Sequence, residues 1–275
     1  MNKQLFLQIN LGIGDHVVAR MFLDGIKHKY DKITIIQAQD ALAYWFKNDP
    51  TRRNFNTQLG SLVFSDPPYF FIPNPTSILP FYPTERIIRE LNNKPVKPNL
   101  DNLCVGKSID IKNYVVITTK VREFPKVLFD QCKDKITPAL QNLTKDHTIV
   151  ILGEREVQRT IEYDAAVNRH RVFGIYNYLK DILPQDKIID LTVPELGIAT
   201  SPFPQFQQDC LILKEAKTVI TIGTGGNYWL SAGISKQTIG LRADSELDRL
   251  GITEYIGVSL TKDIDQFVQY LSNLH

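Results

Sequence analysis

Cysteine is scarce in this sequence, and its three copies stand far apart. Cys104, Cys132 and Cys210 form no Cys-x-x-Cys pair, so they predict neither a disulfide framework nor a zinc site. The chain also lacks the run of about 18 apolar residues that crosses a membrane as a helix. Its N-terminal apolar run is too short and too interrupted for a signal peptide. We therefore expect a cytoplasmic protein without an integral membrane segment.

A surplus of either charge is missing as well. The 275 residues include 32 Lys and Arg against 30 Asp and Glu, a formal net charge of +2. A broad nucleic-acid surface needs a concentrated basic face, so we expect no nucleic-acid partner. Hydrophobic residues make up 43% of the chain and charged residues 23%. These are the proportions of a soluble globular protein with room for one large or two modest domains.

Short apolar runs instead alternate with segments of helical periodicity along the whole chain. The expected strands cover residues 5–9, 33–36, 114–119, 148–152, 188–191, 218–222 and 238–241. The expected helices cover residues 17–26, 41–46, 84–91, 125–143 with a break near Pro138, 172–179, 206–216, 227 onward and 264–271. This alternation predicts an α/β fold with parallel sheets that helices cover on both faces.

Two segments interrupt the alternation. Residues 66–83 are rich in proline and aromatic residues and are expected to be mostly loop or edge strand. Their rings either line an acceptor pocket or pack onto the domain's own core. Residues 92–99 have the Asn and Pro content of a linker. We expect two Rossmann-like domains, residues 1–100 and 101–275, with parallel sheets facing across a cleft that the carboxyl ends of the strands border.

The first glycine turn, Gly12-Ile13-Gly14-Asp15, joins a strand to a helix. It is a poor dinucleotide fingerprint because Val17 stands where a third glycine is needed, and no Gly-Lys-Ser/Thr follows to make a P-loop. Asp15 is either a helix N-cap or a general base that takes a proton from a hydroxyl. His16 either shares the proton transfer or is an ordinary first-turn residue.

The second glycine turn, Gly223-Thr224-Gly225-Gly226-Asn227, follows an apolar strand and opens a helix. Glycines let the backbone approach a ligand closely, and free N–H groups at a helix start favour a phosphate or diphosphate. Thr224 and Asn227 add side-chain hydrogen bonds to such a ligand. The alternative is a tight turn that binds nothing.

Charged residues follow two further strands. Lys120 and Arg122 come after the strand at 114–119, where they either neutralise a departing diphosphate or form a solvated cationic loop. Glu154 comes after the strand at 148–152. It either accepts hydrogen bonds from a ribose or base, or is an exposed carboxylate beside Arg155.

Together these residues resemble the GT-B glycosyltransferases, and most closely the heptosyltransferase family, glycosyltransferase family 9. In that family a strand runs into a Gly-x-Gly-Asp turn, as Asn10-Leu11-Gly12-Ile13-Gly14-Asp15 does here. The resemblance implies that Asp15 is the catalytic base, with His16 beside it. It also implies a set of donor-binding residues: Gly14, Lys120, Arg122, Glu154, Thr224, Gly225, Gly226 and Asn227.

The chain departs from the family at the second turn. The family reads Asp-Thr-Gly-x-x-His there, whereas this chain has Gly223 for the acidic residue and Tyr228 for the histidine. The resemblance implies an inverting, metal-independent transfer of a sugar from a nucleotide-diphosphate sugar to a hydroxyl of a glycan or other acceptor. The N-terminal domain would bind the acceptor and the C-terminal domain the donor. No cofactor is expected besides this co-substrate, and the departures leave the sugar and the nucleobase open.

Three other functions stay open at this point. A sugar-nucleotide epimerase of the same fold would need more acid and base groups than these turns supply. A non-catalytic nucleotide-sugar-binding protein is favoured slightly by the altered second turn, and a dinucleotide oxidoreductase is a distant fourth. Turnover that depends on Asp15 would distinguish the transferase from the binding protein.

Overall fold

The computed structural model describes residues 3–9, 12–38, 50–74, 91, 94–122, 126–155, 158–163, 168–192, 203–223, 226–241 and 258–274. The strands are β1 (Gln4–Ile9), β2 (Lys32–Ala38), β3 (Tyr69–Asn74), β4 (Val115–Thr118), β5 (Lys120–Arg122), β6 (Ile149–Leu152), β7 (Gln158–Tyr163), β8 (Asn168–Gly174), β9 (Ile188–Asp190), β10 (Thr218–Ile222), β11 (Thr238–Leu241) and β12 (Val258–Thr261). The α-helices are α1 (Ile13–Ile26), α3 (Pro50–Val63), α5 (Lys126–Leu143), α6 (Tyr176–Ile182), α7 (Phe203–Glu215), α8 (Gly226–Ile234) and α10 (Ile264–Ser272).

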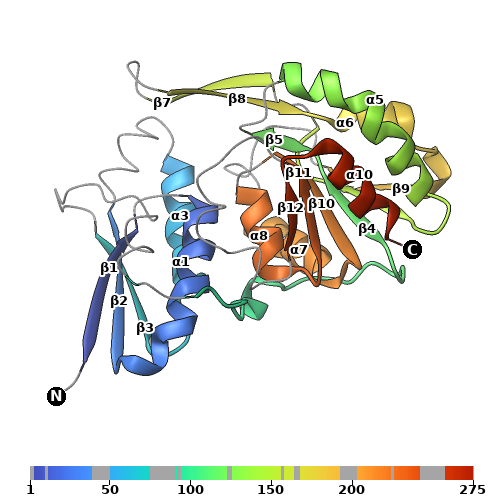
Figure 1. The fold of residues 1–275 in the computed structure, drawn as a ribbon. Helices are drawn as coiled ribbons and strands as arrows, with labels where there is room; N and C mark the ends of the chain where they lie inside the picture. The colour runs from blue at the N-terminus through green and yellow to red at the C-terminus, as the bar shows by residue number, and fades with distance from the viewer. Residues whose placement is uncertain are drawn as a thin grey trace.

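The first three strands form a small parallel sheet in the order β1-β2-β3. Leu7, Ile33 and Ile35 project from its inner face and are buried in the same core as α1 and α3. Helix α1 is buried around most of its circumference, because it lies between this sheet and the rest of the molecule (Figure 1).

A parallel six-stranded sheet of order β12-β11-β10-β4-β6-β9 makes up the second half of the fold. Its central strands β4, β6 and β10 are buried along their whole length, as continuous apolar runs predict for a parallel sheet. Side chains of α7 and α8 pack on one face of this sheet, and side chains of α5, α6 and α10 pack on the other. The predicted α/β class with two parallel sheets is confirmed.

A third, antiparallel sheet of order β5-β8-β7 extends past the carboxyl end of β4 (Figure 1). Residue Thr119 connects the two sheets at this point. Its N–H donates to the Leu152 carbonyl over 3.0 Å, and its own carbonyl accepts from the Ile175 N–H over 2.9 Å. The segment Lys120–Arg122 is therefore a strand of this small sheet rather than a loop.

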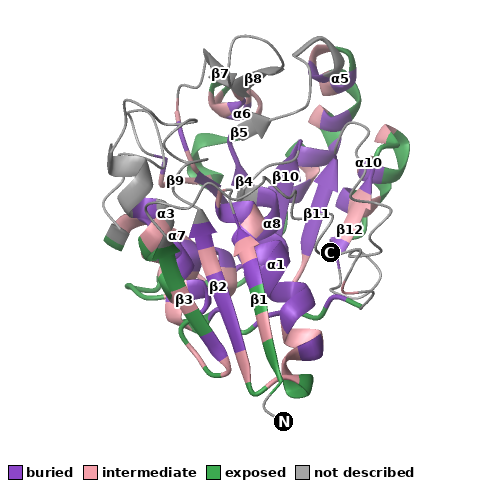
Figure 2. Ribbon diagram, turned by 90° about the vertical axis from the view of Figure 1, so that its left-hand side faces the viewer, coloured by how far each residue is buried: buried purple, intermediate pink, exposed green. Residues whose placement is uncertain are grey.

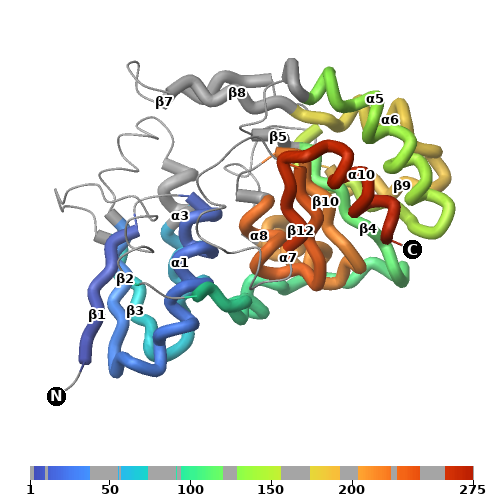
Figure 3. The backbone as a smooth tube through the Cα atoms, in the orientation of Figure 1, coloured from blue at the N-terminus to red at the C-terminus, as the bar shows by residue number. Residues whose placement is uncertain are grey.

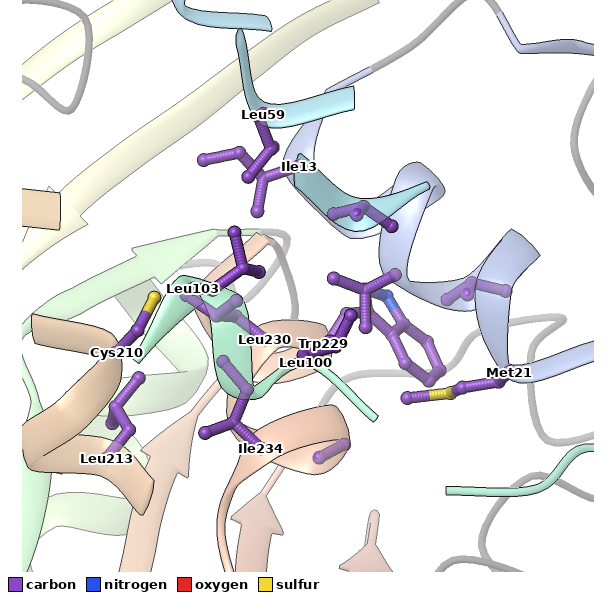
Figure 4. Packing of buried hydrophobic residues seen from close by; sticks show 14 of the residues in the cluster. Ile13, Met21, Leu59, Leu100, Leu103, Cys210, Leu213, Trp229, Leu230 and Ile234 are labelled. Atoms are coloured by element: carbon purple, nitrogen blue, oxygen red, sulfur yellow. The ribbon is translucent and has the colours of Figure 1, made fainter. Parts of the chain in front are cut away.

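One continuous hydrophobic core connects the two parallel sheets. A Cβ atom added to Gly233 of α8 would lie 2.8 Å from Val17 and 3.5 Å from Met21 of α1, so the two helices are in close contact. Leu100 reaches the same contact, and Figure 4 shows it packed beside Trp229, Leu230 and Met21. Rings from α3 and α7 extend the contact, with Phe55 and Phe206 edge-to-face at 5.1 Å.

A buried arginine fastens α1 to the segment before β3. The Arg20 guanidinium pairs with Asp24 over 2.8 Å and with Asp66 over 2.7 Å, and it also donates to the Val63 carbonyl. Its Cζ lies 4.3 Å from the centre of the Tyr69 ring. Because several donors of one fully buried guanidinium are satisfied at once, this cluster holds α1, α3 and β3 in one arrangement.

Most predicted elements are confirmed, and the differences have local causes. Helix α5 runs unbroken through Pro138, and residues 172–174 belong to strand β8 rather than to a helix. The sequence reading missed α3, β12 and the β7–β8 hairpin, and β3 is an edge strand within the proline-rich segment. The expected helix at 41–46 lies outside the described residues, as does the helix at 84–91 except for Leu91.

The cysteines and the length of the helices can be described directly. All three cysteines are free thiols, with Cys132 and Cys210 buried. Burial raises the pKa of the half-buried Cys104 thiol to about 11, so it is a weak nucleophile at neutral pH. Within the described ranges, no helix combines the length and the apolar character needed to cross a membrane.

Candidate functional site

The carboxyl ends of both parallel sheets lie on the upper side of the molecule in Figures 1 and 3. Strand β1 rises from the N-terminus and leads into α1, while β4 leads upward into β5. Strand β10 is parallel to β4 and leads into α8. Since α1 and α8 also pack against each other, the starts of both helices lie on one side of the fold.

The first turn is open on one side at Gly12. This residue is the N-cap of α1, in an extended conformation that any residue adopts (φ −80°, ψ −167°). Among the described residues other than its chain neighbours, no heavy atom would lie within 4 Å of a Cβ atom added there. Neither backbone conformation nor packing requires a glycine here, so the open space beside Gly12 suits the close approach of a ligand.

Asp15 is the third residue of α1 and is half-buried. Its N–H donates to the Gly12 carbonyl over 3.1 Å. The N-cap alternative for Asp15 is wrong, since Gly12 holds that position. A carboxylate in the first turn is stabilised by the free N–H groups and the positive end of the helix dipole. Gly14, the residue before it, is buried.

The structure favours an ordinary structural role for His16. Its ring is fully buried, with Phe64 and Phe71 at centroid distances of 6.3 and 6.4 Å. Nδ1 lies 2.9 Å from the Gly12 carbonyl, which fixes the proton on Nδ1. Burial lowers the pKa of His16 to about 4, against a smaller raising effect of the Gly12 bond. The ring is therefore neutral at pH 7 and braces the turn from within the core.

The second turn begins with a backbone conformation that favours glycine. Gly223 has φ +84°, and its N–H donates to the Leu241 carbonyl over 2.5 Å. Thr224 and Gly225 lie outside the described residues, and Gly226 and Asn227 form the first turn of α8. Tyr228, which stands in the place of the family's histidine, is buried and meets Trp229 edge-to-face at 4.7 Å.

The two basic residues lie where the sequence places them, just beyond β4. The backbones of Lys120 and Arg122 pair with Gly174 and Val172 of β8. This strand begins two residues after the carboxyl end of β4, which is the edge that ligands of parallel sheets approach. The side chains of both residues lie outside the described part of the structure.

Glu154 is buried rather than exposed. Its residue is 2% exposed, so the expected alternative of an exposed carboxylate is wrong. The preceding Gly153 has φ +118°, and a Cβ there would come within 2.7 Å of the Thr119 hydroxyl. That hydroxyl donates to the Glu154 carbonyl over 2.7 Å. Glycine and threonine together turn the chain so that Glu154 folds in at the carboxyl end of β6.

A polar cluster that the sequence reading missed joins the ends of β6 and β9. The Asp190 carboxylate accepts from Tyr176 over 2.6 Å, from Thr192 over 2.5 Å and from Arg155 over 3.3 Å. Burial acts to raise the pKa of Asp190, but the hydrogen bonds and the Arg155 charge outweigh it and lower the pKa. The available signal was an Asp-x-Thr sequence that begins at the last residue of a short strand.

The sequence reading expected a metal-independent donor site because it found no Asp-x-Asp triplet, the sequence typical of metal-bridged donors, and that finding was wrong. Asp263-Ile264-Asp265 stands at the start of α10. Asp263 caps the helix by accepting from the N–H groups of Asp265 and Gln266 over 2.8 and 3.0 Å. Asp265 pairs with Lys135 over 2.9 Å. Both carboxylates therefore have structural roles, and in the described part of the chain no three His, Cys, Asp or Glu residues gather as metal ligands.

Comparison with known proteins gives likenesses of structure only. No family model matches the sequence, and no curated protein matches it. The solved structures that align with it include heptosyltransferase TibC, an iron-containing dodecamer in complex with ADP-D-beta-D-heptose, at 12% identity and a TM-score of 0.48. That alignment covers 88% of this chain and 60% of TibC, so the chain spans less than two thirds of the TibC length.

Two further structures align over nearly the whole chain. A glycosyl transferase family 9 protein from Veillonella parvula shares 9% identity with a TM-score of 0.44, over 99% of this chain and 94% of its own. A protein named as a UDP-N-acetylglucosamine 2-epimerase from Listeria monocytogenes shares 12% identity with a TM-score of 0.43, over 100% of this chain and 88% of its own. They include the family that the sequence motifs resemble, but at these TM-scores the functional argument rests on the chain's own residues.

Proposed function

We propose that the chain is a glycosyltransferase that moves a sugar from a nucleotide-diphosphate sugar to an acceptor hydroxyl. The observation that carries this proposal is the placement of two glycine turns, each between a parallel strand and a helix, on one side of the molecule. One turn carries a carboxylate in a half-buried position. The other presents the N-terminus of α8, which suits a diphosphate.

In the proposed reaction Asp15 removes the proton from the acceptor hydroxyl as the oxygen attacks the anomeric carbon. The new carbon–oxygen bond forms as the bond to the diphosphate oxygen breaks, and a single displacement of this kind inverts the anomeric centre. Negative charge develops on the departing diphosphate. The N-terminus of α8, Lys120 and Arg122 stabilise that charge, which makes a metal-independent reaction the simplest form of the proposal.

Glu154 has a separate proposed role on the donor side. It lies at the carboxyl end of β6, next to β4 in the sheet. Its burial at this edge supports a contact with the polar nucleoside portion of the donor rather than with the diphosphate, since a buried carboxylate repels another anion. The C-terminal part of the chain would then bind the donor and the N-terminal part the acceptor.

The decisive experiment replaces Asp15 by asparagine, which keeps the size of the side chain and removes the base. Donors are first found by thermal shift with a panel of nucleoside diphosphates and nucleotide sugars, since a ligand of the folded state raises its melting temperature. We expect Asp15→Asn to lose about 10²- to 10⁴-fold in turnover and to keep its donor affinity. Asp110→Asn, at an exposed position, is the matched control. Full turnover in Asp15→Asn would show that Asp15 is not the base.

A second candidate function, non-catalytic binding of a nucleotide sugar, is supported by Tyr228. Tyr228 is buried in the core, so it does not present a polar side chain where the family has a histidine in the donor site. The same assays separate the two functions. A binding protein shows a donor-dependent thermal shift and no turnover with any acceptor, and its donor affinity is the same in the Asp15→Asn variant.

A further inference from the structure

The small parallel sheet has an apolar face that the fold leaves open. Its strands are in register, so Phe6, Thr34 and Phe70 form one row across the sheet and Gln8, Ile36 and Ile72 form the next. We call these two rows, with Lys32 beside them, the outer face. On its two flanking strands Phe6 is 62% exposed, Phe70 48% and Ile72 47%, whereas Thr34 on the central strand is 3% exposed and the inner-face residues listed above are buried.

This exposure is concentrated rather than scattered. In the described part of the chain five large hydrophobic residues are exposed, and three of them belong to the outer face. In Figure 2 the viewer looks directly onto β1, β2 and β3, with exposed segments on β1 and β3 and with α1 and α8 behind them. Parallel sheets are normally covered on both faces, so this face has the character of a docking surface.

The sequence of the strands supports the same conclusion. Strand β3 begins Tyr69-Phe70-Phe71-Ile72, an apolar run without alternation. Such a run is typical of a strand buried on both faces, because successive side chains point to opposite sides. In this chain only the inner set, Tyr69 and Phe71, packs into the core.

Charge narrows the choice of partner. The described side chains of the outer face include no carboxylate and one cation, Lys32. Its ammonium lies 4.7 Å from the centre of the Phe70 ring, so it covers apolar surface instead of projecting from it. Binding to anionic lipid surfaces uses several lysines and arginines together. A neutral, flat, apolar face fits another face of the same kind.

Its size fits a second sheet of equal dimensions. Six residues at about 3.3 Å each and three strands at about 4.8 Å spacing give an outline of roughly 20 by 14 Å. This outline is roughly 280 Å² on each copy, well under the roughly 800 Å² per partner of a standard interface. The area therefore predicts a weak, reversible dimer rather than an obligate one.

We propose that the outer face docks on the outer face of a second copy of this chain. A two-fold axis parallel to β2 places Phe6 of each copy over Phe70 of the other, because β1 and β3 flank β2 symmetrically and these residues share a row. The sheets then pack face to face at about 10 Å. The upper edge with both glycine turns stays open, so this dimer does not depend on the proposed function.

Sedimentation equilibrium over a concentration series tests the proposal. We expect the wild-type chain to form dimers that dissociate on dilution. Phe6→Glu and Phe70→Lys each place two unpaired charges in the interface and are expected to be monomers. When the two variants are mixed, Glu at position 6 of one copy faces Lys at position 70 of the other, and a mixed dimer is expected.

Val105→Glu is the matched control, since Val105 is 54% exposed and lies outside the outer face. It should dimerise like the wild type, and at concentrations where the wild type is monomeric all variants should keep its thermal midpoint. A wild-type monomer at every concentration overturns the proposal, as does a dimer that survives Phe6→Glu. Single variants that stay monomeric when mixed overturn the two-fold arrangement. The face would be a membrane contact instead if the wild type is a monomer that cosediments with phosphatidylcholine–phosphatidylglycerol vesicles and the Phe6→Glu variant does not cosediment.

Discussion

At the scale of single residues, Gly12 differs from the glycines that the fold itself requires. Gly223 has a positive φ and Gly233 has no room for a side chain, so their glycines are explained by the fold. Gly12 has neither constraint. If a ligand approaches this turn, a methyl group there will obstruct the ligand and leave the fold unchanged.

We therefore expect Gly12→Ala to keep the thermal midpoint of the wild type within about 1 °C and to weaken binding or turnover of the substrate at the first turn. The measurements are a thermal melt without ligand and steady-state kinetics with the donor that the panel identifies. Gly233→Leu serves as comparison, because its effect should appear in stability. Unchanged kinetics in Gly12→Ala would mean that nothing binds against this turn.

His16 makes the stability of the fold depend on pH. The folded-state pKa of about 4 lies below the usual 6.5, so between these values the unfolded chain binds a proton that the folded chain excludes. Stability is then complete above pH 6.5 and falls as the pH is lowered toward 4, by up to about 3 kcal/mol. Asp209 acts in the opposite direction, since burial raises its pKa to about 6 against a smaller effect of Gln205.

Urea unfolding at pH 7.5 and pH 5 isolates the histidine contribution. His16→Gln keeps an N–H donor for the Gly12 carbonyl and has no proton to gain, so its stability should drop less between the two pH values than that of the wild type. His28→Gln, at an exposed position, should behave as the wild type does. An equal drop in the free energy of unfolding in all three proteins would show that protonation of the His16 ring does not destabilise the fold.

At the scale of elements, the contact between α1 and α8 depends on the missing side chain of Gly233. Gly233→Ala should change stability little, because the gain in helix propensity of about 1 kcal/mol offsets the close contact with Val17. Gly233→Leu should lose about 1–3 kcal/mol through overpacking. Chemical denaturation measures both, and Val17→Ala combined with Gly233→Leu should recover part of the loss. Additive losses in the double variant would place the strain elsewhere.

The elements that sequence reading found and missed differ in how they bury apolar residues. Strands β4, β6 and β10 are apolar runs buried on both faces, and their pattern alone identified them. Helix α3 was missed because the expected helix ends at residue 46 and Pro50 follows it, whereas proline is favoured in the first turn of a helix and begins α3 here. The β7–β8 hairpin mixes charged and apolar residues without a clear period, and only its cross-strand pairing defines it.

The candidate site was also predictable only in part. Position along the chain was enough to place Asp15, Lys120, Arg122 and Glu154 just beyond the carboxyl ends of parallel strands, because in α/β folds that order is regular. Position did not reveal the burial of Glu154 or which residue caps α1, so the exposed alternative for Glu154 and the N-cap alternative for Asp15 were wrong. The contacts of Arg155 with Asp190 and Thr192 join residues more than 30 positions apart, and no local pattern predicts them.

At the scale of the whole molecule, the shared core predicts one cooperative unfolding transition. Domains that move separately have small and polar interfaces, whereas here one hydrophobic cluster runs from Leu7 and Ile9 through α1 and α8 to Val116 and Val219. Far-UV circular dichroism and tryptophan fluorescence should report the same urea midpoint. Residues 1–100 or 101–275 expressed alone should expose the contact and fail to give a stable fold. Two separate transitions would mean that the halves fold independently.

The close packing of α1 on α8 also fixes the distance between the starts of these two helices. With no side chain at Gly233 to separate the helices, the starts of α1 and α8 are held close together. If the acceptor hydroxyl meets the start of α1 and the diphosphate meets the start of α8, the anomeric carbon must lie between them, in line with the attacking and the departing oxygen. The spacing of the two helices would then set how closely the attacking oxygen approaches that carbon. A residue that widened the helix contact would slow the transfer without touching either substrate.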